Sequence, residues 1–135
     1  MNLRLSPIAL AVTCLLARGA YAQGAAAAPN PVGVWRGTSL CTLRPSPCND
    51  EIAVYRITRL NARDSLSLDG RKVVNGQEEE MGGPVGCRLD ASGAHFMCAM
   101  RNSTWHFTIR GDSLVGELRQ ADNRKYRDIR LARSR

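Results

Sequence analysis

Aromatic residues, lysine and histidine are scarce in this chain of 135 residues. Trp, Tyr and Phe together make up 5% of the chain, two residues are His, and nearly all the positive charge is Arg because only Lys72 and Lys125 are Lys. Proteins that bind single-stranded nucleic acids stack successive bases on aromatic side chains. The chain has too few aromatics for such a surface and no nucleic-acid-binding motif. We therefore expect no nucleic acid partner.

Long apolar runs and sustained helical periodicity are missing after residue 32. The apolar run Leu5–Ala17 lies near the start, follows Arg4 and precedes Ala20-Tyr21-Ala22, which has the small-x-small pattern of a cleavage site. This arrangement predicts a signal peptide over residues 1–22, and the run is too short to span a bilayer. We expect an exported protein, periplasmic or secreted, with no transmembrane segment.

Residues 23–32 are rich in Ala and Pro and predict a flexible tether. Residues 33–135 then form one domain of common size. Removal of Arg4 and Arg18 with the leader lowers the net charge from +7 to about +5. A basic surface of this kind suits plain solubility as well as attraction to an acidic partner in the cell envelope.

Four cysteines follow the leader, and none of them is spaced as C-x-x-C. Without that spacing, and without an H-x-x-x-H pair, we expect no metal and no cofactor. An even number of cysteines behind a signal peptide indicates two disulfides. Three pairings are possible, and the spacing favours Cys41–Cys48, across a loop with two prolines, and Cys87–Cys98.

The second of these pairs also follows from strand register. If Ser92-Gly93 is the turn of a hairpin, Leu89 faces Phe96 and Cys87 faces Cys98. Directly opposed residues on two strands have Cβ atoms close enough for a disulfide. Spacing and register therefore predict the same bridge.

Short alternation of apolar and polar residues, broken by Gly, Asp, Asn and Pro, runs through the rest of the chain. This pattern predicts an all-β fold, and eight or nine short strands at this spacing indicate a single small antiparallel up-and-down β-barrel stapled by two disulfides. The strands are expected over 33–41, 51–60, 64–69, 71–78, 84–89, 94–101, 104–110, 113–119 and 125–132.

The clearest hairpin has its turn at Gly111-Asp112. Its inward pairs are expected to be Ile109 with Leu114, Phe107 with Gly116, and Trp105 with Leu118. A slip of one residue would turn both apolar faces outward, so the register is well specified.

Gly33-Val34-Trp35 at the start of the first strand, with an inward-leaning Arg on the last strand, resembles the calycin superfamily, which includes the lipocalins. This resemblance implies that Trp35 closes one end of the barrel and that a basic residue packs on it, with Arg127 as the first candidate and Arg133 as the second. Guanidinium groups stack well on indole rings.

A wider resemblance covers most of the chain after the leader. The segments "GVWRGTSLC", "SPCNDEIAVYRI" and "YRDIRLAR" look like those of a group of small exported bacterial proteins that carry no assigned function. That resemblance implies a signal peptide, two disulfides and a β-fold, and it implies no activity.

A barrel of eight strands is either filled by its own side chains or holds one small ligand. We expect Phe96, Met100, Trp105 and Phe107 to face inward and to line a site for a small apolar ligand. The alternative is a protein-interaction module or enzyme inhibitor of the envelope that docks through its loops, for which the acidic segment 75–84 is a candidate. We expect a monomer in either case.

Catalytic groups are few. Asp50 and Glu51 are adjacent, so in a strand they point to opposite faces, and we expect them to satisfy loop backbone or pair with Arg. His95 and His106 are expected to lie outward on neighbouring strands and close in space. No nucleophile motif accompanies them, so we expect no enzyme.

Overall fold

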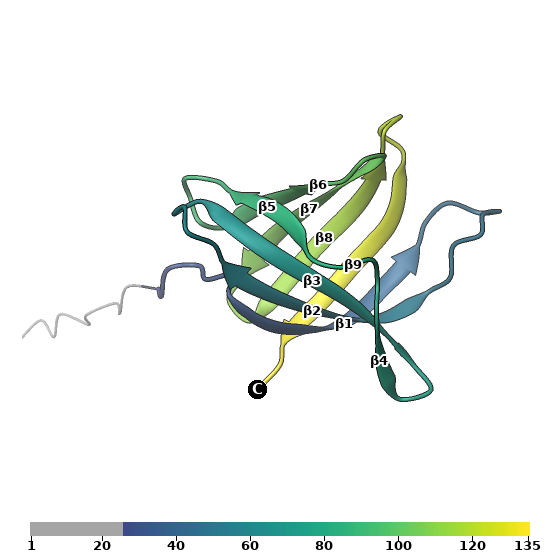
Figure 1. The fold of residues 1–135 in the computed structure, drawn as a ribbon, viewed down its shortest axis with the longest axis horizontal. Coiled ribbons are helices and arrows are strands. Elements are labelled where there is room, and N and C mark those ends of the chain that lie inside the picture. Colours follow the sequence, from purple (N-terminus) through teal and green to yellow (C-terminus); the bar gives the residue numbers. More distant parts are fainter. Residues whose placement is uncertain (1–25) are drawn as a thin grey trace, which may run out of the picture.

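The computed structural model describes residues 26–135, which form a closed antiparallel β-barrel with one further strand outside it (Figure 1). The expected signal peptide, residues 1–22, lies outside the described residues, as do residues 23–25 of the expected tether. Within residues 26–135 no helix is long and apolar enough to cross a membrane. The strands are β1 (Gly33–Cys41), β2 (Glu51–Arg59), β3 (Ser65–Val74), β4 (Gln77–Glu80), β5 (Val85–Leu89), β6 (His95–Ala99), β7 (Ser103–Arg110), β8 (Ser113–Gln120) and β9 (Lys125–Arg133).

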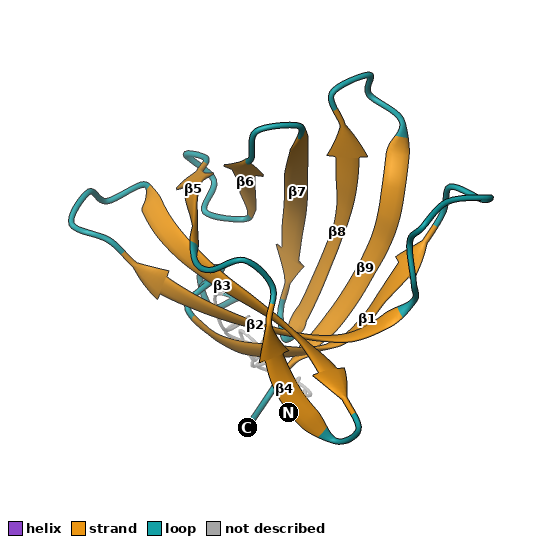
Figure 2. Cartoon of the chain, turned by 45° about the vertical axis from the view of Figure 1, so that its right-hand side comes forward, coloured by secondary structure: helices purple, strands orange, loops and turns teal. Residues whose placement is uncertain are grey.

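Barrel strands follow the order of the chain, with β4 left out. Each pairs antiparallel with the next, β3 pairs with β5, and β9 returns to pair with β1, which closes the barrel (Figure 2). β4 pairs only with β3 and lies outside the ring. The predicted all-β, up-and-down antiparallel barrel is confirmed.

Both predicted disulfides are present. Cys41 is bonded to Cys48 across the loop between β1 and β2, and Cys87 is bonded to Cys98 between β5 and β6. Cys87 stands directly opposite Cys98, and Leu89 stands opposite Phe96. The β5–β6 register is therefore the predicted one.

The β7–β8 hairpin also has the predicted register, with Ile109 opposite Leu114, Phe107 opposite Gly116, and Trp105 opposite Leu118. A Cβ atom at position 116 would overlap the ring of Phe107. Gly116 therefore leaves the space that the aromatic side chain occupies.

The predicted strand break at Gly70 is wrong, and the acidic segment 75–84 is a loop only in part, because its residues 77–80 form a strand. β3 continues through Gly70 to Val74, and the chain then turns at Asn75-Gly76 into β4. Both turn residues have positive φ, 51° and 79°, as a tight two-residue hairpin turn requires. A Cβ at position 70 would lie 3.4 Å from the Trp105 ring, so Gly70 is closely covered by that side chain.

Side chains from all eight barrel strands fill the interior. The aromatic rings are in contact, with centroids 4.8 Å apart for Phe96 and Phe107 and 5.5 Å apart for Tyr55 and Trp105. The buried cluster consists of Trp35, Ala53, Tyr55, Ile57, Leu66, Leu68, Cys87, Phe96, Cys98, Trp105, Phe107, Ile109, Leu114, Leu118, Ile129 and Leu131.

One end of the barrel is closed by Trp35, which is fully buried. The guanidinium carbon of Arg133 lies 4.2 Å from the centre of the Trp35 ring, so Arg133 is the residue that stacks on Trp35. The prediction of Arg127 as the first candidate for this role is wrong. β9 runs antiparallel to β1 and places Arg133 opposite Trp35, whereas Arg127 stands opposite Cys41 near the other end. Position 33 favours glycine, because its φ is 137° and a Cβ would lie 2.7 Å from the Arg133 nitrogen that is bonded to Val32.

The chain just before β1 completes this closure. Trp35 Nε1 donates a hydrogen bond to the carbonyl of Pro31 (2.8 Å), and Arg133 donates to the carbonyls of Val32 (2.8 Å) and Asn30 (2.7 Å). Pro31 is buried. Residues 30–32 are thus part of the barrel, and the expected tether can extend no further than residue 29.

Candidate binding site at the mouth of the barrel

The end of the barrel opposite Trp35, here called the mouth, is surrounded by four connections: residues 42–50, 81–84, 100–102 and 121–124. Figure 2 shows the β6–β7 and β8–β9 turns at the top and the β1–β2 loop at the right. The mouth therefore draws its residues from segments far apart in the sequence.

Arg127 reaches into the barrel at the mouth and is held by acceptors from β1, β2 and the loop between them. Its Nη1 donates to the carbonyl of Asn49 (3.0 Å) and to both oxygens of Ser39 (3.3 Å), and its Nη2 lies 3.3 Å from Glu51 Oε1. The Arg127 and Glu51 side chains are only 13% and 19% exposed. A buried charge needs a partner of opposite sign, and Glu51 makes this part of the mouth neutral overall.

Tyr55 lies beneath this ion pair and is fully buried. Burial raises the pKa of Tyr55 to about 12, and this rise is partly opposed by the hydroxyl of Ser39 and the charge of Arg127. Tyr55 is therefore a neutral phenol at physiological pH.

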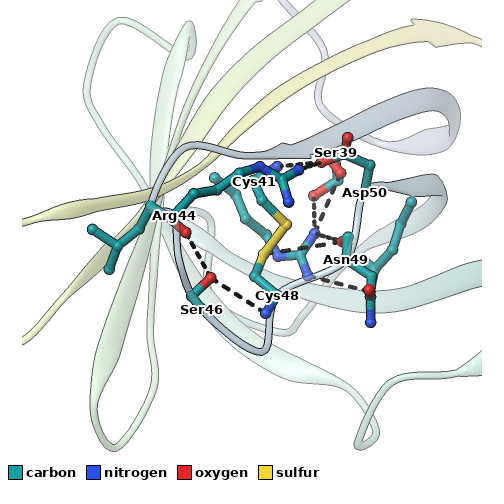
Figure 3. A network of polar contacts seen from close by, with 10 residues as sticks. Ser39, Cys41, Arg44, Ser46, Cys48, Asn49 and Asp50 are labelled. Carbon is teal, nitrogen blue, oxygen red and sulfur yellow. Dashed lines mark hydrogen bonds and ion pairs between the residues drawn. A yellow bond between two sulfur atoms is a disulfide. The ribbon is translucent and has the colours of Figure 1, made fainter.

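The loop at residues 42–50 is held by contacts within itself (Figure 3). Besides the Cys41–Cys48 disulfide, Asp50 Oδ1 accepts from the backbone N–H of Cys41 (2.8 Å) and from Arg44 (3.0 Å). Ser46 Oγ donates to the Leu43 carbonyl (2.6 Å). The expectation that Asp50 and Glu51 satisfy loop backbone or pair with Arg is confirmed.

Trp105 and Leu118 form the apolar side of the mouth, and each is nearly buried. Met81, Val85, Met100 and Tyr126 are partly buried and pack against the core cluster to which Trp105 and Leu118 belong. Tyr126 takes this position because it is the extra residue of a β-bulge in β9. On β8, Leu118 pairs with Arg127 and the next residue, Arg119, pairs with Lys125, so Tyr126 is left without a partner.

Trp105 Nε1 is buried and has no hydrogen-bond partner. This contrasts with Trp35, whose Nε1 donates to Pro31. Few buried donors in native proteins lack a partner, and each such group needs an explanation. The unpaired indole N–H lies two strands from Arg127, since Leu118 of β8 pairs with Trp105 on one side and with Arg127 on the other.

The four residues expected to line a ligand site divide into two groups. Trp105 and Met100 lie at the mouth, whereas Phe96 and Phe107 are 3% and 2% exposed and stack on each other inside the barrel. Met100 also donates its backbone N–H to the Ser103 carbonyl (2.9 Å). Only the first two are placed to meet a molecule that arrives from solvent.

Sequence reasoning missed Ser39 and Tyr55 as residues of the mouth. The alternation of β2, with Ala53, Tyr55 and Ile57 on one face, is the signal that would have placed Tyr55 inside. The same alternation along β1 would have placed Ser39 inside, because Ser39 comes two residues after Gly37 and four residues after Trp35.

A groove with a volume of about 660 Å³ lies on the outer wall of the barrel, across β5 to β9. Its lining includes His95, Met97, His106, Glu117 and Arg130. The two histidines are exposed and share this groove, in line with the expectation that they lie outward on neighbouring strands.

Comparison of the chain with protein-family models, with curated proteins and with solved structures gave no match.

Proposed function

We propose that this chain is an exported, non-enzymatic binding protein whose mouth takes a small, largely apolar molecule that carries a hydrogen-bond acceptor. The observation that carries the proposal is the buried, unpaired N–H of Trp105. Leaving such a donor unsatisfied costs about 1–3 kcal/mol, and an acceptor on a ligand would remove that cost.

The surroundings of Trp105 support the chemical class of the ligand. Met81, Val85, Met100 and Leu118 offer apolar contact, as most small-molecule sites do. Because Glu51 already balances the charge of Arg127, the ligand needs an acceptor such as a carbonyl oxygen and does not need a full negative charge.

Export to the periplasm or the medium is part of the same proposal. It is supported by the leader pattern of residues 1–22 and by the two disulfides, since disulfides form and persist in oxidising compartments. We infer that the exported chain acts as a monomer.

Native and denaturing mass spectrometry of the protein recovered from the periplasm tests the proposal. We expect a discrete extra mass in the native spectrum that disappears on denaturation. Trp105→Phe keeps an aromatic ring and removes the N–H, so it should lose the extra mass. Trp35→Phe is the control and should keep it, because the Trp35 N–H is already bonded to Pro31. A bare parent protein, or an adduct that survives Trp105→Phe, contradicts the proposal.

The β1–β2 loop favours a second candidate function, which is docking to another envelope protein. Its exposed residues Thr42, Arg44 and Pro45 are presented by a segment that the Cys41–Cys48 bridge and Asp50 hold in one conformation. Preorganised loops of this kind bind partners at a lower entropic cost. The same native spectrum separates the two functions, since a protein partner adds kilodaltons and a small ligand adds hundreds of daltons.

A further inference from the structure

The outer-wall groove brings together two imidazoles and a thioether. His95 and Met97 are two residues apart on β6 and therefore share one face, and His106 of β7 stands directly opposite Met97. Opposed residues on antiparallel strands have Cβ atoms about 4.5–5.5 Å apart, and diagonal neighbours such as His95 and His106 are about 7–8 Å apart, within reach of long side chains. All three residues line the groove.

The three side chains are accessible and one of them is oriented. Met97 is 45% exposed, and both histidines are exposed. His95 Nδ1 lies 2.9 Å from the hydroxyl of Thr108, the residue opposite it on β7. A hydrogen bond at one ring nitrogen fixes the ring and leaves the other nitrogen, Nε2, to bind a metal, as the second shell does in metal sites.

The charged side chains beside these three residues form ion pairs with other residues. Arg88 stands opposite Met97 on β5, but its guanidinium is paired with Asp64 at 2.7 Å. Glu117 stands opposite His106 on β8 and is paired with Arg119 and Lys125. The other two carboxylates of the groove are bonded as well, since Asp128 is paired with Lys125 (2.9 Å) and Asp90 accepts from the hydroxyl of Ser92 (2.6 Å).

We propose that His95, Met97 and His106 form a binding site for Cu(I). The thioether of Met97 is the third ligand of this proposal, because Met97 stands directly opposite His106 and lines the same groove as both histidines. Thioethers select soft ions such as Cu(I), whereas carboxylates suit hard cations. All four cysteines of the barrel are in disulfides, so no thiolate competes for the ion. This site is independent of the mouth.

The test is an anaerobic Cu(I) titration of the purified, disulfide-bonded protein against a chromophoric Cu(I) chelator, with ascorbate present. We expect one Cu(I) per chain. Met97→Leu keeps the side-chain volume and removes the sulfur, and should weaken binding at least tenfold. His106→Asn should do the same. Met100→Leu, which lies at the mouth, is the matched control and should bind Cu(I) as the parent does.

A second readout locates the ion directly. With methyl-labelled methionine, Ag(I) as a diamagnetic substitute for Cu(I) should shift the methyl resonance of Met97 and leave those of Met81 and Met100 unchanged. Equal Cu(I) affinity in the parent and in Met97→Leu would overturn the proposal, as would binding of Zn(II) as tight as that of Cu(I). Weak binding of several ions that persists in both variants would show adventitious binding only and would overturn it too.

Discussion

The two tryptophans of this barrel differ in the hydrogen bonding of the indole nitrogen, which is paired in Trp35 and unpaired in Trp105. Trp35→Phe leaves the carbonyl of Pro31 without its donor and weakens the stacking with Arg133. We expect it to lower the free energy of unfolding by about 1–3 kcal/mol. Trp105→Phe loses the same part of the ring but removes a donor that has no partner, so its free energy of unfolding should fall by less than that of Trp35→Phe. Urea denaturation followed by far-UV circular dichroism measures both.

Each variant is the control for the other, because both lose the same part of an indole ring. An equal loss of stability in the two would mean that the Trp105 N–H finds an acceptor in solution. It would also remove the observation that supports a ligand at the mouth.

Arg127 and Arg133 show which side-chain positions could be predicted from the sequence. Alternation along the last strand places both on the inward face with Ile129 and Leu131, which is correct. The choice between them depends on pairing direction, because the start of β1 meets the end of an antiparallel β9. The predicted up-and-down topology already contained that information, so Arg133 was the better first choice for Trp35.

Strands that alternate apolar and polar residues and flank a tight turn were predicted together with their register. Strand β4 was not predicted. β4 consists of Gln77 followed by three acids and has no apolar face, so alternation gives no signal there. Two of its acids are paired with the protein's own basic residues, Glu78 with Arg56 (2.6 Å) and Glu79 with Lys72 (3.8 Å). The dipeptide Asn75-Gly76 was the available signal, since Asn-Gly is the strongest short-range indication of a hairpin.

The β3–β4 hairpin should open without unfolding the barrel, because β4 is paired on one side only. Gly76→Ala places a Cβ at a φ of 79°, where open space surrounds it but the backbone is strained by about 1–2 kcal/mol. We expect faster amide hydrogen exchange in β4 and at Met81, whose N–H donates to the Gly70 carbonyl. The urea midpoint of the whole chain should not change measurably.

Gly86→Ala in β5 is the matched control. Its Cβ also meets nothing within 4 Å, and its φ is not positive. Exchange rates and midpoint should both stay at the parent values. A fall in global stability with Gly76→Ala would show that β4 is an integral part of the barrel.

At the scale of the whole molecule, the closed barrel and its two bridges follow from patterns that repeat along the sequence, whereas the mouth does not. Arg127 is bound by Ser39, Asn49 and Glu51, which reach it because β1 pairs with β2 on one side and β9 on the other. No spacing of residues within one segment of the sequence predicts these contacts of Arg127. The unpaired nitrogen of Trp105 is likewise a property of packing, and only the three-dimensional structure shows it.

Tyr55 links this packing to the pH dependence of the molecule's stability. Burial raises its pKa to about 12, above the value of about 10 in an unfolded chain. The folded state therefore favours the neutral phenol, and this stabilisation is complete below about pH 10 and is lost as the pH rises toward 12. We expect the free energy of unfolding to fall by roughly 2–3 kcal/mol over that window, at about 1.4 kcal/mol per pH unit.

Lys125 adds to the same decline, since hydrogen bonding to Asp128 raises its pKa. Tyr55→Phe should therefore flatten the decline without abolishing it, as measured by urea denaturation relative to its own value at pH 8. An unchanged slope in Tyr55→Phe would mean that water reaches the phenol, and that the mouth is open to solvent as far as Tyr55.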